Sequence, residues 1–175
     1  MTDAAAQTAD WPANPFWDFS IAVYRRPGVG DACLALQEKR GIDVNLLLYF
    51  AWLGIAQGQR LGSDEIASVV IHAAAWHDGV VRPLRVLRTA MKGGAKGAPP
   101  ALAERLRGQI KSAELNAERI EQQMLYAMRS QVSRSARGSL EGARANIGGY
   151  FTALKIQADS ADWSAVDAIL SMTDT

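Results

Sequence analysis

Cysteine is almost absent from this 175-residue sequence, which contains Cys33 alone. A single thiol cannot form a disulfide within the chain, and it cannot supply the several thiolates of a structural zinc site. A chain of this length can bury a substantial core without such crosslinks. Because hydrophobic residues make up 49% of the sequence, we expect an ordinary globular domain stabilised by apolar packing.

A large excess of charge is also missing. The sequence has 19 Lys and Arg against 18 Asp and Glu, a formal net charge of +1. This balance gives no global signature of a nucleic-acid-binding or membrane-binding protein. Histidine is scarce too: His72 and His77 are the two in the sequence, and five residues separate them by about 140° around a helix. Such a pair cannot readily share a metal ion, so neither a metal site nor a cofactor is predicted.

Long apolar runs and export signals are lacking. The longest apolar run, residues 46–56, would rise about 16 Å as a helix, roughly half the thickness of a bilayer core. Residues 1–10 carry no basic residue and no apolar stretch, both of which a secretory signal needs. We therefore expect no transmembrane segment and a cytoplasmic location.

Helix signals are present where strand signals are not. No stretch shows the sustained alternation of apolar and polar residues that is typical of strands. Asn14 before Pro15 predicts a helix start, Gly41 after two basic residues predicts a helix end, and Asp43 predicts the next start. The fold class is therefore predicted as all-α, a single-domain helical bundle of about six to eight helices. Its predicted organisation is a flexible N-terminal tail over residues 1–13, one helical domain over 14–175, and a Gly/Pro-rich linker over 92–100.

One long helix is predicted after the linker, from Pro100 to about residue 132. Apolar and small residues recur along it at alternating spacings of 4 and 3, at Leu106, Ile110, Ala113, Ala117, Ile120, Met124 and Ala127. This heptad-like seam favours packing inside the bundle or pairing with another copy. The short connection around Gly41 also predicts a tight antiparallel hairpin between the helices on either side of it.

Two sequence segments resemble a known family. They are DVNLLL at residues 43–48 and RPLRVLR at residues 82–88, and Phe16, Trp17, Glu114 and Glu118 fit the same pattern. Together they are similar to small proteobacterial proteins known as a family of unknown function, over roughly residues 14–130. The resemblance implies a bacterial cytoplasmic protein with a helical fold. It brings no catalytic residue, cofactor or partner.

Several polar residues occupy positions that need an explanation. Asn45 lies in the most apolar helix, where a buried amide must be hydrogen-bonded, and Arg85 and Arg88 could pair with Glu114 or Glu118 across the linker. Glu114, Glu118 and Glu121 share one face of the long helix, which indicates a solvated or salt-bridged face. If these polar side chains instead converge with His77, they predict a polar ligand pocket. Its residues would be Asn45, His77, Arg85, Arg88, Glu114 and Glu118; none is predicted to be catalytic.

A local basic segment spans residues 79–111, where eight basic residues face a single acidic one, Glu104. The predicted partner-binding residues are Arg82, Arg85, Arg88, Lys92 and Lys96. The segment has no aromatic residue, which disfavours stacking against single-stranded nucleic acid. The preferred hypothesis is therefore a non-enzymatic interaction or adaptor protein that meets an acidic protein or a second copy. The alternatives are a helical-bundle enzyme or small-ligand-binding protein, and nucleic-acid binding through the basic segment.

Overall fold

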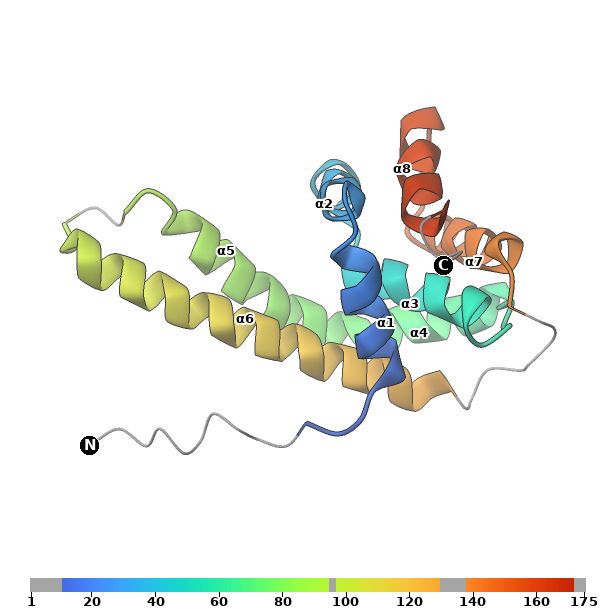
Figure 1. Cartoon of the computed structure of the whole chain (residues 1–175), viewed down its shortest axis with the longest axis horizontal. Helices are drawn as coiled ribbons and strands as arrows, with labels where there is room; N and C mark the ends of the chain where they lie inside the picture. The colour runs from blue at the N-terminus through green and yellow to red at the C-terminus, as the bar shows by residue number, and fades with distance from the viewer. Residues whose placement is uncertain (1–10, 95–96, 130–137, 172–175) are drawn as a thin grey trace.

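The computed structural model describes residues 11–94, 97–129 and 138–171, and all regular structure within these ranges is helical (Figure 1). This confirms the predicted all-α bundle. The helices are α1 (Pro15–Tyr24), α2 (Val29–Arg40), α3 (Val44–Ile55), α4 (Ser63–Trp76), a π-helical segment η2 (His77–Val81), α5 (Arg82–Ala90), α6 (Pro100–Met128), α7 (Leu140–Ala153) and α8 (Ser160–Ser171). Among the described helices, none has both the length and the apolar composition needed to cross a bilayer.

Local sequence explains where these helices begin and end. The Asn14 side chain accepts hydrogen bonds from the backbone N–H groups of Phe16 and Trp17, and the Asp43 side chain caps α3 by accepting from Asn45 N–H. Gly41 ends α2 with φ of 66°, a left-handed conformation that glycine adopts without a steric penalty. The three helix boundaries predicted at these residues are confirmed.

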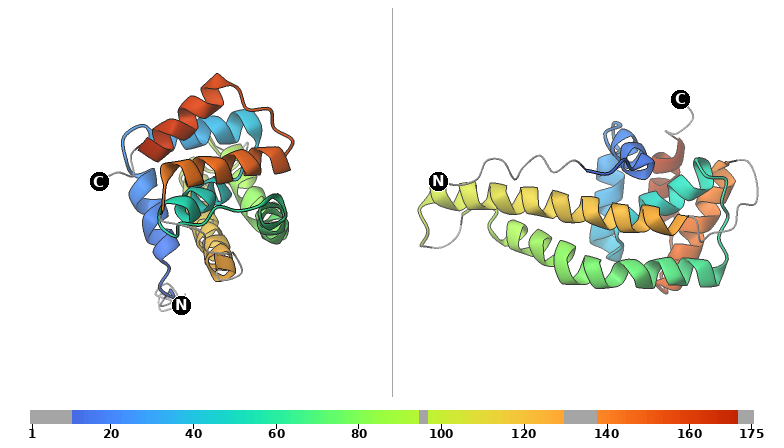
Figure 2. Two further views of the ribbon diagram at one scale, coloured as in Figure 1. Left: turned by 90° about the vertical axis from the view of Figure 1, so that its right-hand side faces the viewer. Right: turned by 90° about the horizontal axis from the view of Figure 1, so that it is seen from below.

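The core is built around α3. Every residue of α3 from Asn45 to Gly54 is buried, because other helices surround it on all sides. Looking along α3, Figure 2 (left) shows α1, α4, α6 and α7 arranged around it. α7 approaches most closely, since Gly54 leaves room for the backbone at Ala143. An apolar helix of this length is therefore the centre of the bundle.

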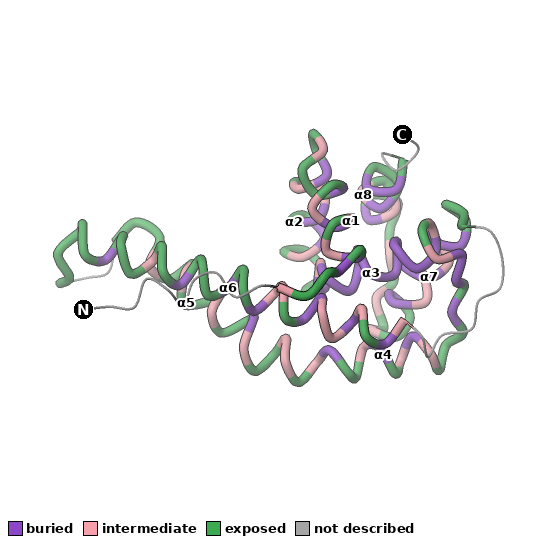
Figure 3. Tube along the Cα trace, turned by 60° about the horizontal axis from the view of Figure 1, so that its bottom comes forward, coloured by how far each residue is buried: buried purple, intermediate pink, exposed green. Residues whose placement is uncertain are grey.

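A two-helix arm projects from this core. α4, η2 and α5 run on as one continuous rod, and α5 then pairs with the first half of α6, away from the other helices (Figures 1 and 2). We define the arm as residues 82–94 and 97–113. None of the residues of α5 is fully buried, and the arm is mostly exposed in Figure 3, whereas buried residues concentrate around α3 and α7.

The structure changes two expectations about packing. α2 crosses α3 steeply and packs mainly on α8, so the predicted antiparallel hairpin of α2 and α3 is wrong (Figures 1 and 2). The glycine between them allows the chain to turn through a large angle instead of doubling back. Within α6 the predicted seam is divided: Ile110 and Ala117 are buried, but Leu106 and Ile120 are exposed.

Some predictions fall on residues outside the described ranges. These are the first ten residues of the predicted tail, Lys96 in the linker, and the stretch 130–137. Within the described part, α6 ends at Met128, close to the predicted end near residue 132. The described residues of the linker lie between α5 and α6 at the tip of the arm, and there Gly93, Gly94 and Gly97 adopt positive φ.

Candidate functional site

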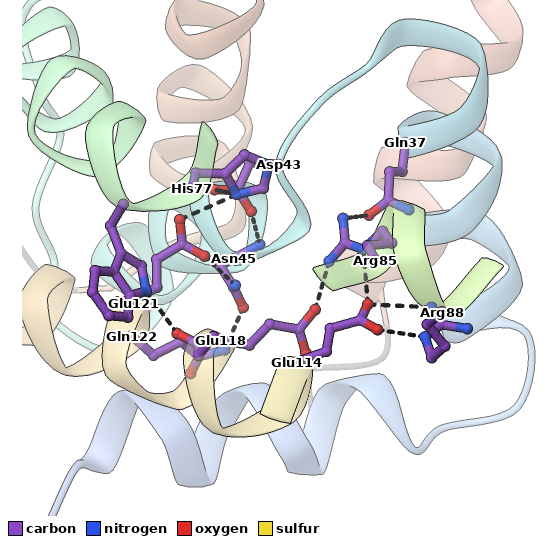
Figure 4. Close-up of polar contacts among 12 residues, drawn as sticks. Gln37, Asp43, Asn45, His77, Arg85, Arg88, Glu114, Glu118, Glu121 and Gln122 are labelled. Atoms are coloured by element: carbon purple, nitrogen blue, oxygen red, sulfur yellow. Dashed lines mark hydrogen bonds and ion pairs between the residues drawn. The ribbon is translucent and has the colours of Figure 1, made fainter. Parts of the chain in front are cut away.

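Two neighbouring polar clusters lie along α6, where it faces η2, α5 and the start of α3 (Figure 4). Both clusters hold charged groups away from solvent, where a charged side chain needs a partner. The histidine cluster consists of Asp43, Asn45, His77, Glu121 and Gln122. The arginine cluster consists of Gln37, Arg85, Arg88, Glu114 and Glu118.

In the histidine cluster, two carboxylates meet one imidazole nitrogen. His77 Nδ1 lies 3.0 Å from Asp43 Oδ2 and 3.2 Å from Glu121 Oε1. The Glu121 side chain is fully buried and the Asp43 side chain is 7% exposed, whereas His77 keeps 15% of its side chain in solvent. The three residues come from the N-cap of α3, the start of η2 and the C-terminal third of α6. Only the tertiary fold brings them together.

The remaining atoms of the carboxylates are held by a hydrogen-bonded shell. Asn45 Nδ2 donates to Glu121 Oε2 at 2.6 Å, and Gln122 Nε2 donates to Asn45 Oδ1 at 2.8 Å. Asp43 Oδ1 accepts from Asn45 N–H at 2.8 Å, while Asp43 N–H donates to the Tyr150 hydroxyl at 3.0 Å. Both the nitrogen and the oxygen of the Asn45 side-chain amide are therefore hydrogen-bonded, as a buried amide in an apolar helix requires.

The π-helical segment places His77. Arg82 N–H donates to the His77 carbonyl, a bond one residue longer than in an α-helix. Pro83 explains the wider turn, because proline has no N–H for the α-helical bond and its ring would clash with the carbonyl four residues back. Just before η2, Trp76 Nε1 donates to the Ala117 carbonyl of α6 at 2.9 Å. This contact fixes η2 against α6, so that His77 faces Glu121.

The electrostatics of the histidine cluster favour a charged imidazole. Burial by itself lowers the pKa of His77, but the contacts and charges of Asp43 and Glu121 outweigh it and raise the pKa to about 10. Burial raises the pKa of Glu121, and the nearby charge of Asp43 adds to this, while His77 opposes it. The cluster is thus a site where a positive charge holds two buried acids together.

The arginine cluster joins the base of the arm to α6. Arg85 donates to Glu114 Oε1 at 3.1 Å, to Glu118 Oε1 at 2.5 Å and to Gln37 Oε1 at 2.7 Å, and Arg88 also binds Glu114. Burial by itself raises the pKa of Glu114, but the hydrogen bonds from the two arginines outweigh it and hold the pKa below its usual range. Burial raises the pKa of Glu118, and Arg85 opposes this. The pairing predicted across the linker is present.

The predicted pocket residues therefore divide between two clusters. Asn45 and His77 lie in the histidine cluster, whereas the two arginines and their glutamates form the arginine cluster (Figure 4). The predicted partner-binding residues Arg82 and Lys92 are exposed on the arm. Glu121, which the sequence placed on a solvated or salt-bridged face, is buried, because the acidic face of α6 is the face that packs against the rest of the molecule.

The sequence did not indicate all of the site. Asp43 was explained as a helix cap, and Gln37, Gln122 and Tyr150 carried no signal that distinguished them. Glu121 could have been found, because its spacing from Glu114 and Glu118 puts all three on one helical face. With His77 and Asp43, Glu121 forms a group whose possible metal-ligating atoms all lie within 4.8 Å of one another.

Comparison with known protein families identifies the chain's family. The sequence profile of a family described as "Protein of unknown function (DUF2390)" matches residues 15–125, which include both clusters and the arm. No curated protein matches the chain. No solved structure matches it either.

Proposed function

The chain belongs to the DUF2390 family of proteins of unknown function, a membership that carries no activity with it, and we propose that it is a non-enzymatic interaction protein that binds an acidic protein partner through its arm. The proposal rests on one observation: the arm projects from the core and carries exposed cations that form no ion pair with the residues that the structure describes. The single buried cysteine supports a reducing compartment, and we place the protein in the cytoplasm.

The charge of the arm supports an acidic partner. Lys92, Arg105 and Lys111 are exposed and form no ion pair with any described residue. Arg82 lies 3.6 Å from Asp78, but both side chains are more than half exposed, so solvent screens that contact. Charges that stay unpaired on a projecting element attract an acidic surface and steer its approach.

Apolar side chains lie between these cations. Val86, Leu87, Leu102 and Leu106 are each about half exposed or more, with values of 62%, 50%, 61% and 49%. Exposed apolar residues surrounded by polar ones are typical of protein interfaces, where the apolar contacts supply affinity. The partner that fits is therefore an acidic segment with an apolar stripe, such as an amphipathic helix.

The arginines of the arm have two different roles in this proposal. Arg85 and Arg88 are bound by Glu114 and Glu118, so we assign them to holding α5 against α6 and not to contact with a partner. The exposed cations further along the arm are assigned to the partner. The ion-paired base would keep the arm in one conformation, which lowers the entropic cost of binding.

A charge-reversal variant tests the proposal. Lys92, Arg105 and Lys111 are changed together to Glu, and the matched control changes Arg25, Arg60 and Lys155, which are exposed elsewhere on the molecule, to Glu. Proteins retained from the native cell lysate are crosslinked, and the crosslinked residues are mapped on both chains. We expect an acidic segment of the partner to crosslink to the arm of the wild type, and the control should give the same crosslinks. The yield of these crosslinks should fall at least about tenfold in the arm variant.

A salt titration and a variant with fewer apolar residues on the arm extend the test. Retention should fall as NaCl rises from about 50 to 500 mM, because screening weakens exposed charge contacts. Replacing Leu102 and Leu106 with Asn should weaken the same crosslinks without changing net charge. Equal retention by arm variant and control would contradict the proposal. Retention of nucleic acid alone would favour the nucleic-acid alternative, and crosslinks between two copies through Leu106 and Ile120 would favour self-association.

A further inference from the structure

We propose that Asp43, His77 and Glu121 form a binding site for one divalent transition-metal ion of the zinc class. The proposal is independent of the arm, and it replaces the expectation from sequence that the chain has no metal site. Its basis is the way three potential ligand atoms from three separate segments face one point inside the molecule (Figure 4).

The donor spacing suits a metal ion. Zinc is bound by nitrogen and carboxylate oxygen at about 2.0–2.2 Å, so neighbouring tetrahedral ligand atoms lie about 3.3–3.6 Å apart. His77 Nδ1 is 3.0 Å from Asp43 Oδ2 and 3.2 Å from Glu121 Oε1. These two distances would need to lengthen by only a few tenths of an ångström, and the possible ligand atoms of the three residues all lie within 4.8 Å of one another.

One buried carboxylate oxygen of the cluster has an ion-pair contact but no hydrogen bond. Nδ1 of His77 carries at most one hydrogen, and its hydrogen bond is with Glu121 Oε1. Asp43 Oδ2 is buried and accepts no hydrogen bond from the described residues, although it lies next to the same nitrogen. An unsatisfied buried carboxylate oxygen is costly. A cation at this point would be bound by both carboxylates and the imidazole together.

The surrounding hydrogen bonds orient the donors toward that point. Asn45 engages Glu121 Oε2 through its side chain and Asp43 Oδ1 through its backbone, so that Glu121 Oε1 and Asp43 Oδ2 face His77 Nδ1 as the candidate ligand atoms. Gln122 in turn holds the Asn45 amide. Such outer partners commonly fix the ligands of a metal site and tune its affinity.

The donor set indicates the class of metal. A bound ion displaces the proton of His77, and the two carboxylates with the neutral imidazole then carry a charge of −2, which balances a divalent ion. Imidazole nitrogen suits zinc, iron, nickel and copper, whereas magnesium and calcium prefer an all-oxygen shell. His77 keeps 15% of its side chain in solvent, so the cluster lies close to the molecular surface.

Metal titration of the whole chain tests the site. The protein is freed of metal with a chelator and titrated with Zn²⁺ by calorimetry and with Co²⁺ by visible absorption. We expect one equivalent bound by wild type. His77→Gln and Glu121→Gln should weaken that binding by about 100-fold or more, because each removes a direct ligand. The control His72→Gln should bind as wild type does, because His72 is an exposed histidine outside the cluster.

A second measurement uses wild-type protein and does not depend on whether the variants fold. In wild-type protein loaded with Co²⁺, paramagnetic broadening of the His77 ring signals would support the site whatever the variants do. No binding by folded wild type, broadening of His72 alone, or full binding by folded His77→Gln would each overturn the proposal.

Discussion

At the residue scale, Gly54 is the position where α3 and α7 come closest. A Cβ at Gly54 would overlap the backbone of Ala143, and backbone cannot move aside as a flexible side chain can. Gly54→Ala should therefore lower the free energy of unfolding by about 2–3 kcal/mol, as overpacked cores do. Denaturant unfolding followed by circular dichroism measures this change.

The control for this prediction lies on α6. A Cβ at Gly108 would meet no atom within 4 Å, and glycine is unfavourable in an exposed helix. Gly108→Ala should therefore leave stability unchanged or raise it by up to about 1 kcal/mol. If the two variants were equally stable, the close approach of α3 and α7 would be contradicted.

Also at the residue scale, Glu114 is the shared acceptor of the arginine cluster. Its side chain is 7% exposed and binds both Arg85 and Arg88. Glu114→Gln leaves two partly buried cations without a full counter-charge, and we expect a loss of about 2 kcal/mol in thermal or denaturant unfolding. Glu104→Gln is the matched control, because it removes an exposed pair with Arg107 on the same helix and should change nothing measurable.

At the scale of the element, α8 is attached to α2 by a charged clamp. Asp162 accepts hydrogen bonds from Arg40 Nε and Lys39 Nζ, both at 2.9 Å, and Asp159 contacts the same two cations. Arg40 above all, with Lys39, holds the pKa of Asp162 well below its ordinary value. Because the pKa is lower in the folded state, this clamp contributes stability above about pH 4 and loses it as the pH falls through the lowered pKa.

The lowered pKa of Asp162 predicts that the stability of α8 depends on pH. As the pH falls below about 4, the amides of α8 should lose hydrogen-exchange protection before those of α3, since α8 is held by the clamp together with a few buried apolar residues, whereas α3 is buried throughout. Asp162→Asn should weaken α8 already at pH 7 and remove most of the acid dependence. Protection of α8 that stays constant from pH 7 to the acid unfolding of the whole chain would contradict the role of the clamp.

At the scale of the whole molecule, stability should be distributed unevenly. The interior of α3 is buried throughout, whereas no residue of α5 is fully buried. Amide exchange at pH 7 should therefore be slowest in α3 and fastest, among the helices, in the outer part of the arm. Equally slow exchange in α5 and α3 would mean that the arm is covered in solution, which would favour self-association over a free arm.

The sequence by itself determined the helical class and several boundaries. Asn14, Gly41 and Asp43 act within one turn of their own position, through caps and backbone conformation, so local chemistry is enough to place them. The pairing of Arg85 and Arg88 with Glu114 and Glu118 could also be predicted from the sequence. Only residues 91–99 separate the two helices along the chain, and opposite charges on facing helices attract.

Only the tertiary structure decided which face of α6 turns inward. Periodicity indicated an apolar seam, but Leu106 and Ile120 are exposed while Glu121 is buried, because α6 packs against polar groups of other segments as well as apolar ones. The histidine cluster has the same origin. His77 and Glu121 are 44 residues apart, and no local pattern links them to the cap of α3. Their approach depends on how the helices pack around α3, a property of the whole chain that short-range sequence signals do not carry.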